Sequence, residues 1–206
     1  MVQLVSYGKA AFPGLAALFL VWGGISWWTL GFSAFTSYAH VAQSAAPLPK
    51  KPPTLVLTDQ SGNSFDFAQM TGRFRLVTFG YLDCTGTCPI TMAELFEINE
   101  QLGERGNLQL LTITLDPKGD RRELLHHTWT NYGKPKSWAL ATPGEIEREP
   151  YWEQLRQMGM WVDQNAQGLP IHDDRSFLVN REGLITDSFS GVPPLEVLAA
   201  AMRREG

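Results

Sequence analysis

The sequence has little of three things, and each shortage excludes a class of protein. Only two of the 206 residues are cysteines, Cys84 and Cys88, which is too few for a fold held together by a disulfide framework. Basic residues number 17 against 21 acidic ones, and no cluster of Lys and Arg alternates with aromatic residues. Nucleic acid is therefore not an expected partner. The chain also lacks internal repeats, which excludes a repeat architecture.

Charge is missing from the N-terminal quarter of the chain. No Asp, Glu, Lys or Arg lies between Lys9 and Lys50, and residues 10–35 are rich in Leu, Ala, Phe and Trp. This apolar run is longer than the roughly 20 residues that a helix needs to cross a bilayer. We therefore expect a membrane anchor, a transmembrane helix, over residues 1–36. A cleaved signal peptide and a buried soluble helix are the alternatives.

The positive-inside rule orients this anchor. Lys9 and the α-amino group are the only positive charges before the apolar run, so they predict a cytoplasmic N-terminus. The remainder of the chain is then extracytoplasmic. Residues 37–53 are rich in Pro and Ala and predict an extended linker. Residues 54–206 are long enough for one domain with a core of its own.

The stretch from Arg75 to Glu94 organises this domain. It opens as an apolar run of β-branched and aromatic residues, which is typical of a buried strand. A short polar turn with Cys84 and Cys88 follows, and Pro89 is favoured at the start of a helix. The two thiols therefore lie where a strand is succeeded by a helix N-terminus, whose partial positive charge favours thiolate over thiol.

The remaining pattern alternates between strand and helix. Such alternation predicts an α/β fold with a central, largely parallel sheet flanked by helices. The expected elements are two short strands over 54–58 and 64–67, the central strand, a helix over 89–104, a strand over 108–115, a helix up to 132 capped by Asp120, a strand over 138–141, a helix within 142–160, a loop over 168–174, a β-hairpin of 175–179 with 184–190, and a helix over 193–204.

Two sulfurs four residues apart around a tight turn can converge as a disulfide or around one soft metal ion. A plain stabilising disulfide is the simplest alternative. A trigonal site for a soft metal needs a third ligand, and the chain offers four histidines. His40 lies in the linker, His126 and His127 are neighbours on a helix, and His172 lies in a loop before a strand. Composition alone does not choose among them.

Three stretches resemble the SCO/SenC family: FGYLDCTGTCP from Phe79, LTITLDPKGD from Leu111, and HDDRSFLVNREG from His172. The resemblance implies a thioredoxin-like fold, with a central mixed sheet flanked by helices, in a membrane-anchored protein that binds copper, as Cu(I) or Cu(II). By motif, the implied metal ligands are Cys84, Cys88 and His172. The implied partner is the copper subunit of a respiratory cytochrome c oxidase or another copper chaperone.

The chain departs from the family pattern beside each ligand. Ile171 precedes the histidine where the family usually has Asp, and Asp173 and Asp174 follow it. Asp83 precedes the first cysteine where the family often has His or Asn. A carboxylate next to the histidine can orient its imidazole ring. A carboxylate beside Cys84 opposes thiolate formation.

Two functions of different classes follow. The first is a copper-binding assembly factor, which carries metal and is not an enzyme with turnover. The alternative is a membrane-anchored thiol–disulfide oxidoreductase, in which Cys84 and Cys88 are the catalytic redox-active pair and reduce partner cysteines. A peroxidase is third, since the cysteine turn has no neighbouring Arg.

Overall fold

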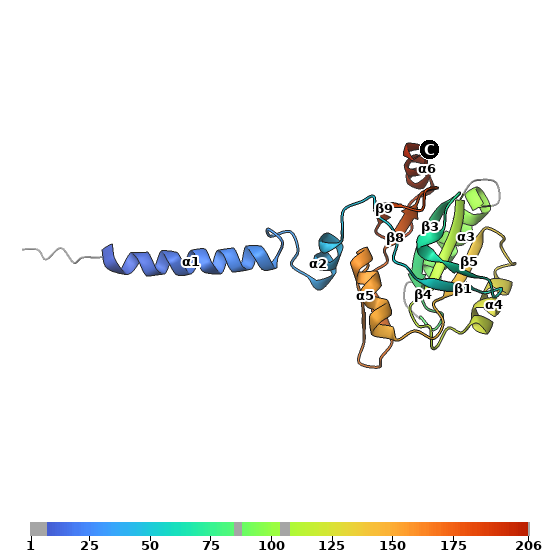
Figure 1. Cartoon of the computed structure of the whole chain (residues 1–206), viewed down its shortest axis with the longest axis horizontal. Helices are drawn as coiled ribbons and strands as arrows, with labels where there is room; N and C mark the ends of the chain where they lie inside the picture. Colours follow the sequence, from blue (N-terminus) through green and yellow to red (C-terminus); the bar gives the residue numbers. More distant parts are fainter. Residues whose placement is uncertain (1–7, 85–87, 104–107, 206) are drawn as a thin grey trace, which may run out of the picture.

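A seven-stranded mixed sheet forms the centre of the domain (Figure 1). The computed structural model describes residues 8–84, 88–103 and 108–205. The strands lie in the order β2-β1-β5-β4-β3-β8-β9, where β3 is parallel to β4 and β4 to β5, and the other pairs are antiparallel. The strands are β1 (Val56–Asp59), β2 (Ser64–Asp66), β3 (Phe74–Gly80), β4 (Leu108–Thr114), β5 (Trp138–Thr142), β8 (Ser176–Val179) and β9 (Ile185–Phe189).

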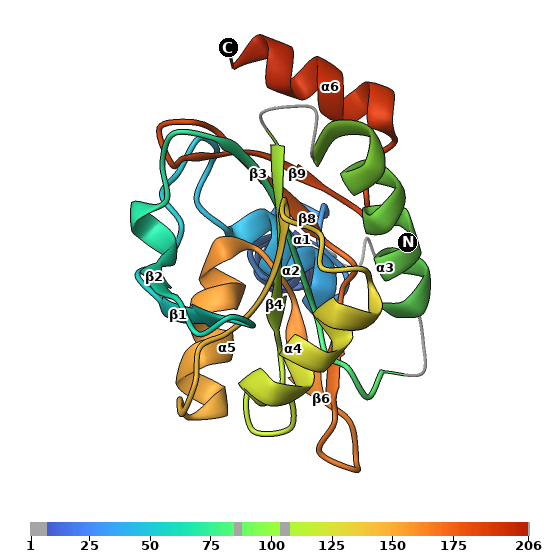
Figure 2. The same ribbon diagram turned by 90° about the vertical axis from the view of Figure 1, so that its right-hand side faces the viewer.

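Helices cover both faces of this sheet (Figure 2). One face packs against α3 (Cys88–Ile98), α4 (Arg122–Asn131) and α6 (Leu195–Arg204), and the other packs against α5 (Arg148–Met158). The alternation of side chains along a strand explains how two cores form. In β3, Phe74 and Leu76 face the first core, while Val77 and Phe79 face the second. The nearly unbroken apolar run of β4 is therefore a consequence of burial on both faces.

Most elements expected from the sequence are confirmed, with shifted ends. The helix expected over 89–104 begins at Cys88 and, after Ile98, continues as a π-helical turn, Asn99–Gly103. A short 3₁₀ turn, Phe67–Gln69, follows β2. The helix expected within 142–160 is shorter, as α5. The mixed sheet that the family resemblance implies is confirmed, because the three central strands are parallel and the pairs towards both edges are antiparallel.

The expectation that Asp120 caps a helix is wrong. Arg121 occupies the N-cap position of α4 and makes no side-chain capping bond. The Asp120 carboxylate turns inward, where it accepts hydrogen bonds from the Leu82 backbone N–H at 3.0 Å and the Thr114 hydroxyl at 2.5 Å. The carboxylate is therefore engaged by the Leu82 N–H and the Thr114 hydroxyl and does not cap the helix.

The loop expected over 168–174 is also corrected. It contains β7 (Pro170–His172), which pairs antiparallel with β6 (Val162–Gln164) as a separate two-stranded sheet. The sequences of β6 and β7 show no clear alternation of apolar and polar residues, because only the first residue of each strand, Val162 and Pro170, is fully buried. The hairpin expected just after it is confirmed as β8 and β9.

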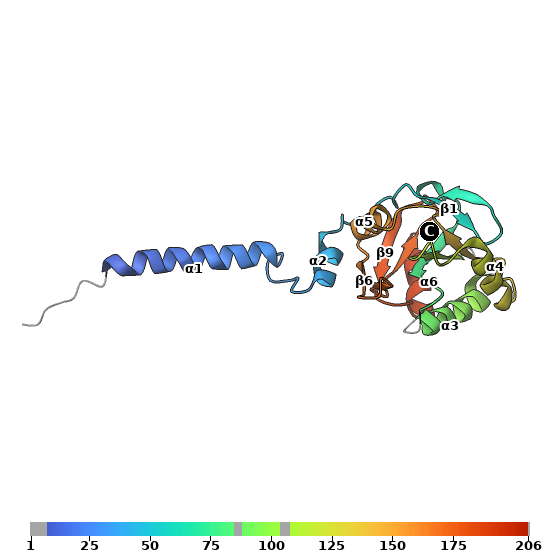
Figure 3. The same cartoon turned by 90° about the horizontal axis from the view of Figure 1, so that it is seen from below.

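The N-terminal segment extends away from the domain (Figure 3). It holds α1 (Gly8–Trp28) and α2 (Ser37–Ser44). None of the helices in the described ranges combines the length and apolar character that crossing a bilayer requires. The transmembrane helix expected over residues 1–36 is therefore not borne out. Helix α2 lies in the range expected as linker and contacts α5.

Candidate metal centre

The cysteine turn follows the central strand, as the sequence predicts. Strand β3 ends at Gly80, and the backbone N–H of Cys84 donates a hydrogen bond of 3.3 Å to the carbonyl of Tyr81. Cys84 is half-buried. Cys88 is the first residue of α3, so its backbone belongs to the helix N-terminus. The side chain of Cys88 lies outside what the structure describes, and its pairing or ligand role stays a prediction.

His172 lies at the end of β7, opposite Val162 in the β6–β7 hairpin. Its Nδ1 lies 2.5 Å from the backbone carbonyl of Asp173. Because a carbonyl oxygen only accepts, Nδ1 carries the proton of this hydrogen bond. In the neutral ring, Nε2 then keeps the lone pair that a metal ion requires. Burial lowers the pKa of His172, which favours the neutral, ligating form, while the Asp173 carbonyl and the carboxylates of Asp173 and Asp174 act in the opposite direction.

The fold brings Cys84 and His172 to one place, although 88 positions separate them in the chain numbering (172 − 84). The ring of Tyr81 contacts the ring of His172 edge to face, with centroids 6.4 Å apart. Both predicted ligands also line one cavity of about 540 Å³. The cavity lies against the sheet face that α3 and α4 cover, and its other lining residues include Thr78, Thr112, Met92, Leu124, Leu125 and Tyr132.

The remaining histidines lie elsewhere. The Nδ1 of His126 lies 3.1 Å from the carbonyl of Gln60, and His40 bonds the hydroxyl of Ser44 within α2. His127 is exposed on α4. Within the ranges that the structure describes, no three side chains of His, Cys, Asp or Glu form a metal-binding group. The predicted set of three includes Cys88, whose side chain is not among those described.

The two departures from the family pattern differ in their place, since Asp83 lines the same cavity as Cys84 and His172, whereas Ile171 is not among its lining residues. Ile171 is exposed on β7, and Asp83 is exposed in the turn, where solvent screens its charge. The Asp173 carboxylate does not orient the imidazole. It accepts hydrogen bonds from the backbone N–H groups of Trp161 at 3.0 Å and Arg175 at 3.2 Å. The imidazole is oriented by the Asp173 carbonyl instead.

Asp120 is the site residue that the sequence does not identify. It is only 3% exposed and lines the same cavity as Cys84 and His172. Burial raises the pKa of Asp120 to about 6, against the opposing effect of its two hydrogen bonds. One signal was available: Asp120 follows the carboxyl end of a central strand, where the functional groups of α/β sheets gather.

The site therefore consists of a thiol corner at the end of a central strand and one imidazole from a separate hairpin, on a thioredoxin-like α/β fold. The profile of the SCO1/SenC family matches residues 50–205, which is most of the chain. The chain belongs to this family.

A curated relative of the chain is described as a copper-binding protein. The chain is 35% identical over 82 residues to a candidate copper-binding protein of Stutzerimonas stutzeri, a match that covers 39% of this chain and 40% of that protein. The chain thus spans less than half the length of this curated relative.

Solved structures of the family share the fold. A SCO1/SenC family lipoprotein from Bacillus anthracis superposes with a TM-score of 0.69 at 23% identity, covering 77% of this chain and 96% of that one. Bradyrhizobium japonicum ScoI with copper bound gives 0.62 at 19% identity, with 76% and 99% covered. BsSco, from the Sco family of cytochrome c oxidase assembly proteins, gives 0.63 at 19% identity, with 79% and 97% covered.

Proposed function

We propose that this protein is a copper carrier that binds one copper ion through Sγ of Cys84, Sγ of Cys88 and Nε2 of His172. The observation that carries the proposal is the meeting of Cys84 and His172 at one cavity, with the ring of Tyr81 against the imidazole. Two thiolates and one imidazole suit Cu(I), and imidazole also accepts Cu(II). A relative with copper bound supports the choice of metal.

Three ligands also suit a carrier better than a structural site. A structural zinc site usually closes with four protein ligands. A site with three leaves one side open, and an incoming ligand from the acceptor protein can enter there before a donor thiolate leaves. The copper ion is therefore cargo, and the role of this chain is to hold its own three donors in place and release them stepwise.

We place the acceptor among the copper-containing subunits of respiratory cytochrome c oxidases, with another copper chaperone as the second choice. The family to which the chain belongs and the description of BsSco support this choice. Copper-loaded protein, mixed with the copper-free acceptor domain, is expected to lose its metal while the acceptor gains the absorption of its copper centre. Retention of copper by this chain in the presence of the acceptor would argue against delivery.

The ligand set is tested by Cu(I) titration of the reduced, purified full-length chain against a colorimetric chelator. We expect one copper per chain, and a loss of affinity of about ten-fold or more in His172→Ala. His127→Ala is the matched control, because His127 is exposed on α4 and is not among the residues that line the cavity. Equal copper affinity in wild type and His172→Ala would remove His172 from the site.

A thiol–disulfide oxidoreductase is the second candidate. The observations that favour it are the backbone of Cys88 at a helix N-terminus and the buried carboxyl group of Asp120 in the cavity that Cys84 lines. In this reaction Cys84 and Cys88 become a disulfide, and the two electrons and two protons they lose reduce one disulfide of the partner to two thiols. A mixed disulfide trapped by Cys88→Ser would support it.

Membrane attachment through the N-terminal segment completes the proposal. The apolar side chains of α1 are exposed, among them Leu18, Phe19 and Trp27, and a family lipoprotein offers a precedent for attachment. We expect the domain to face the extracytoplasmic side. The full chain should fractionate with membranes and be accessible to protease from that side, whereas recovery in the soluble fraction would contradict attachment.

A further inference from the structure

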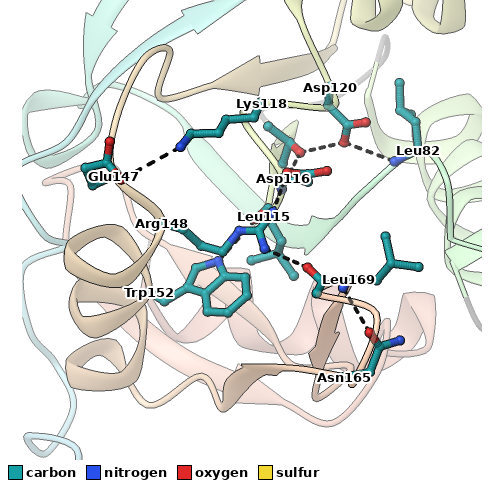
Figure 4. Close-up of polar contacts among 12 residues, drawn as sticks. Leu82, Leu115, Asp116, Lys118, Asp120, Glu147, Arg148, Trp152, Asn165 and Leu169 are labelled. Carbon is teal, nitrogen blue, oxygen red and sulfur yellow. Dashed lines mark hydrogen bonds and ion pairs between the residues drawn. The ribbon is translucent and has the colours of Figure 1, made fainter.

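The ligands of the proposed copper site come from two separate segments of the fold, here called its two arms: the turn that carries Cys84 and the hairpin that carries His172. Cys84 follows β3, whereas His172 lies on the β6–β7 hairpin outside the main sheet. A three-ligand site requires these arms to keep a fixed separation, because a small displacement of one ligand weakens metal binding. The polar contacts of Arg148 join the two arms (Figure 4).

Arg148, the first residue of α5, makes three contacts. Its Nη1 donates to the carbonyl of Gly168 at 2.6 Å, and its Nη2 donates to Oδ1 of Asp116 at 3.0 Å. Its guanidinium lies over the ring of Trp152, 5.2 Å from the centroid. Trp152 is itself held by a hydrogen bond of 3.1 Å from Nε1 to the Leu115 carbonyl. The Arg148 guanidinium is thus held against α5 by its packing on Trp152, and from this position it bonds both Gly168 and Asp116.

Gly168 lies at the tip of the hairpin that carries His172. Side-chain and backbone bonds of Asn165 close this tip, with Leu169 N–H donating to Asn165 Oδ1 at 2.9 Å and Gly168 N–H donating to the Asn165 carbonyl at 2.9 Å. From there the strand register runs from Gln164↔Pro170 to Val162↔His172. A short, closed hairpin moves as one unit, so fixing its tip also fixes His172.

Asp116 belongs to the loop that supports the cysteine turn. Asp120, in the same loop, accepts the Leu82 N–H at 3.0 Å, two residues before Cys84. Gly119 leaves room for the Asp116 carboxylate, since a Cβ on Gly119 would lie 2.4 Å from Asp116 Oδ2. The path from His172 to Cys84 therefore runs through the hairpin tip, Arg148, the Asp116–Asp120 loop and Leu82.

We propose that Arg148 is a positioning residue that sets the separation between His172 and the Cys84 turn, by joining the tip of the β6–β7 hairpin to the loop that holds the turn. The inference rests on the proposed copper site and assigns it a residue that touches neither ligand. Arginine suits this task because its planar fork presents several donors in fixed directions. Lysine, with one ammonium group, can keep the ion pair with Asp116 or reach the Gly168 carbonyl, but it cannot reproduce the fork.

The test compares Arg148→Met and Arg148→Lys with wild type, using the full-length chain. We expect Cu(I) affinity to fall about ten-fold in Arg148→Met, with partial recovery in Arg148→Lys. The electron paramagnetic resonance spectrum of the Cu(II) form should change in Arg148→Met, because the geometry of the donors changes. Arg204→Met is the matched control, since Arg204 pairs with Asp187 at 2.5 Å in another part of the domain.

A second measurement does not depend on copper. In the metal-free chain, Arg148→Met should accelerate amide hydrogen exchange in β6 and β7 and leave β3 and β4 unchanged. Gly119→Ala, which displaces the Asp116 carboxylate, should produce the same local change while leaving Arg148 intact. Unaltered exchange in the hairpin, together with wild-type affinity and spectrum, would overturn the role of Arg148.

These results separate the two proposals. If the wild-type chain binds no copper, the proposed function fails, and the exchange data still decide whether Arg148 holds the hairpin. If wild type binds copper and Arg148→Met matches it in affinity, spectrum and exchange, only the positioning role fails. Global unfolding of Arg148→Met would appear as fast exchange in every strand, in which case Gly119→Ala and Arg148→Lys decide the question.

Discussion

The Asp120 carboxylate accepts a hydrogen bond of 3.0 Å from the backbone N–H of Leu82, 38 residues earlier in the chain. This bond joins the loop after β4 to the turn that carries Cys84. The same oxygen of Asp120 also accepts the Thr114 hydroxyl, so the end of β4 and the cysteine turn meet at one buried carboxylate. The arrangement links the stability of the site to the ionisation of Asp120.

The first prediction concerns the pH dependence of stability. The pKa of Asp120 is about 6 in the folded chain and about 3.9 in an unfolded one. Between these values the folded state binds more protons, so the free energy of unfolding falls as the pH rises through this window. Asp120→Asn keeps an acceptor oxygen and removes the charge. We expect the variant to be more stable than wild type at pH 7 by about 3 kcal/mol, with the difference vanishing near pH 4.

Urea unfolding of both chains at several pH values measures this difference. The sign of the difference in unfolding free energy is as informative as its size. If the ionised carboxylate stabilised the fold, Asp120→Asn would be less stable than wild type at neutral pH. A stability difference that stays constant from pH 4 to pH 7 would show that Asp120 does not titrate in this window.

The second prediction concerns a buried hydrogen bond behind the site. The hydroxyl of Tyr151 donates to the Thr114 carbonyl at 2.7 Å, and Tyr151 is fully buried. Tyr151→Phe should lower the free energy of unfolding by about 1 kcal/mol, since the carbonyl loses one buried partner. Tyr38→Phe is the control: it preserves the ring under Arg175 and should change stability by less than about 0.5 kcal/mol. Equal effects of the two substitutions in thermal or urea unfolding would contradict the prediction.

The third prediction separates backbone strain from steric contact at two glycines. Gly183 and Gly72 both have positive φ, at 82° and 84°. A Cβ on Gly183 would lie 2.8 Å from the Met70 carbonyl oxygen, whereas a Cβ on Gly72 meets open space. Alanine at Gly72 should cost about 1 kcal/mol for the left-handed conformation alone. Alanine at Gly183 should cost more, because backbone must move as well. Comparable unfolding midpoints for the two variants would refute the steric part.

The fourth prediction concerns the base of the hairpin that carries His172. Asp173 accepts hydrogen bonds from the backbone N–H groups of Trp161 and Arg175. Asp173→Ala leaves both without this partner and should destabilise the chain by about 2 kcal/mol. Asp173→Asn retains one acceptor oxygen and should cost less. Copper affinity should follow the same order, as read by competition with a chelator, and a reversed order would exclude this role for the carboxylate.

Local pattern is enough to predict the central elements. The apolar run before the cysteines predicts β3, and the run over 108–115 predicts β4, because burial on both faces leaves an uninterrupted apolar sequence. Pro89 marks the beginning of α3 to within one residue. Motifs place Cys84 and His172 among the candidate ligands, and the fold then brings these two to one cavity.

Other features do not follow from local pattern. Asp120 is a residue type that commonly caps helices, yet its carboxylate accepts hydrogen bonds from the nearby Thr114 hydroxyl and from the N–H of Leu82, which lies 38 residues away and outside any short window of sequence. The β6–β7 hairpin lacks the alternation that identifies a strand, because few of its side chains are buried. Arg148 has no motif, and its place between Gly168 and Asp116 depends on the packing of α5 against β4.

The sequence by itself determined the central strands, most of the helices of the domain and where the two thiols stand relative to them, because periodicity and turn chemistry act over a few neighbouring residues. Only the tertiary structure decided that His172 lies beside the Cys84 turn, that Asp120 points inward and that Arg148 joins the two arms. Each of these contacts connects residues at least 20 positions apart, and their partners are set by how sheets, loops and helices pack.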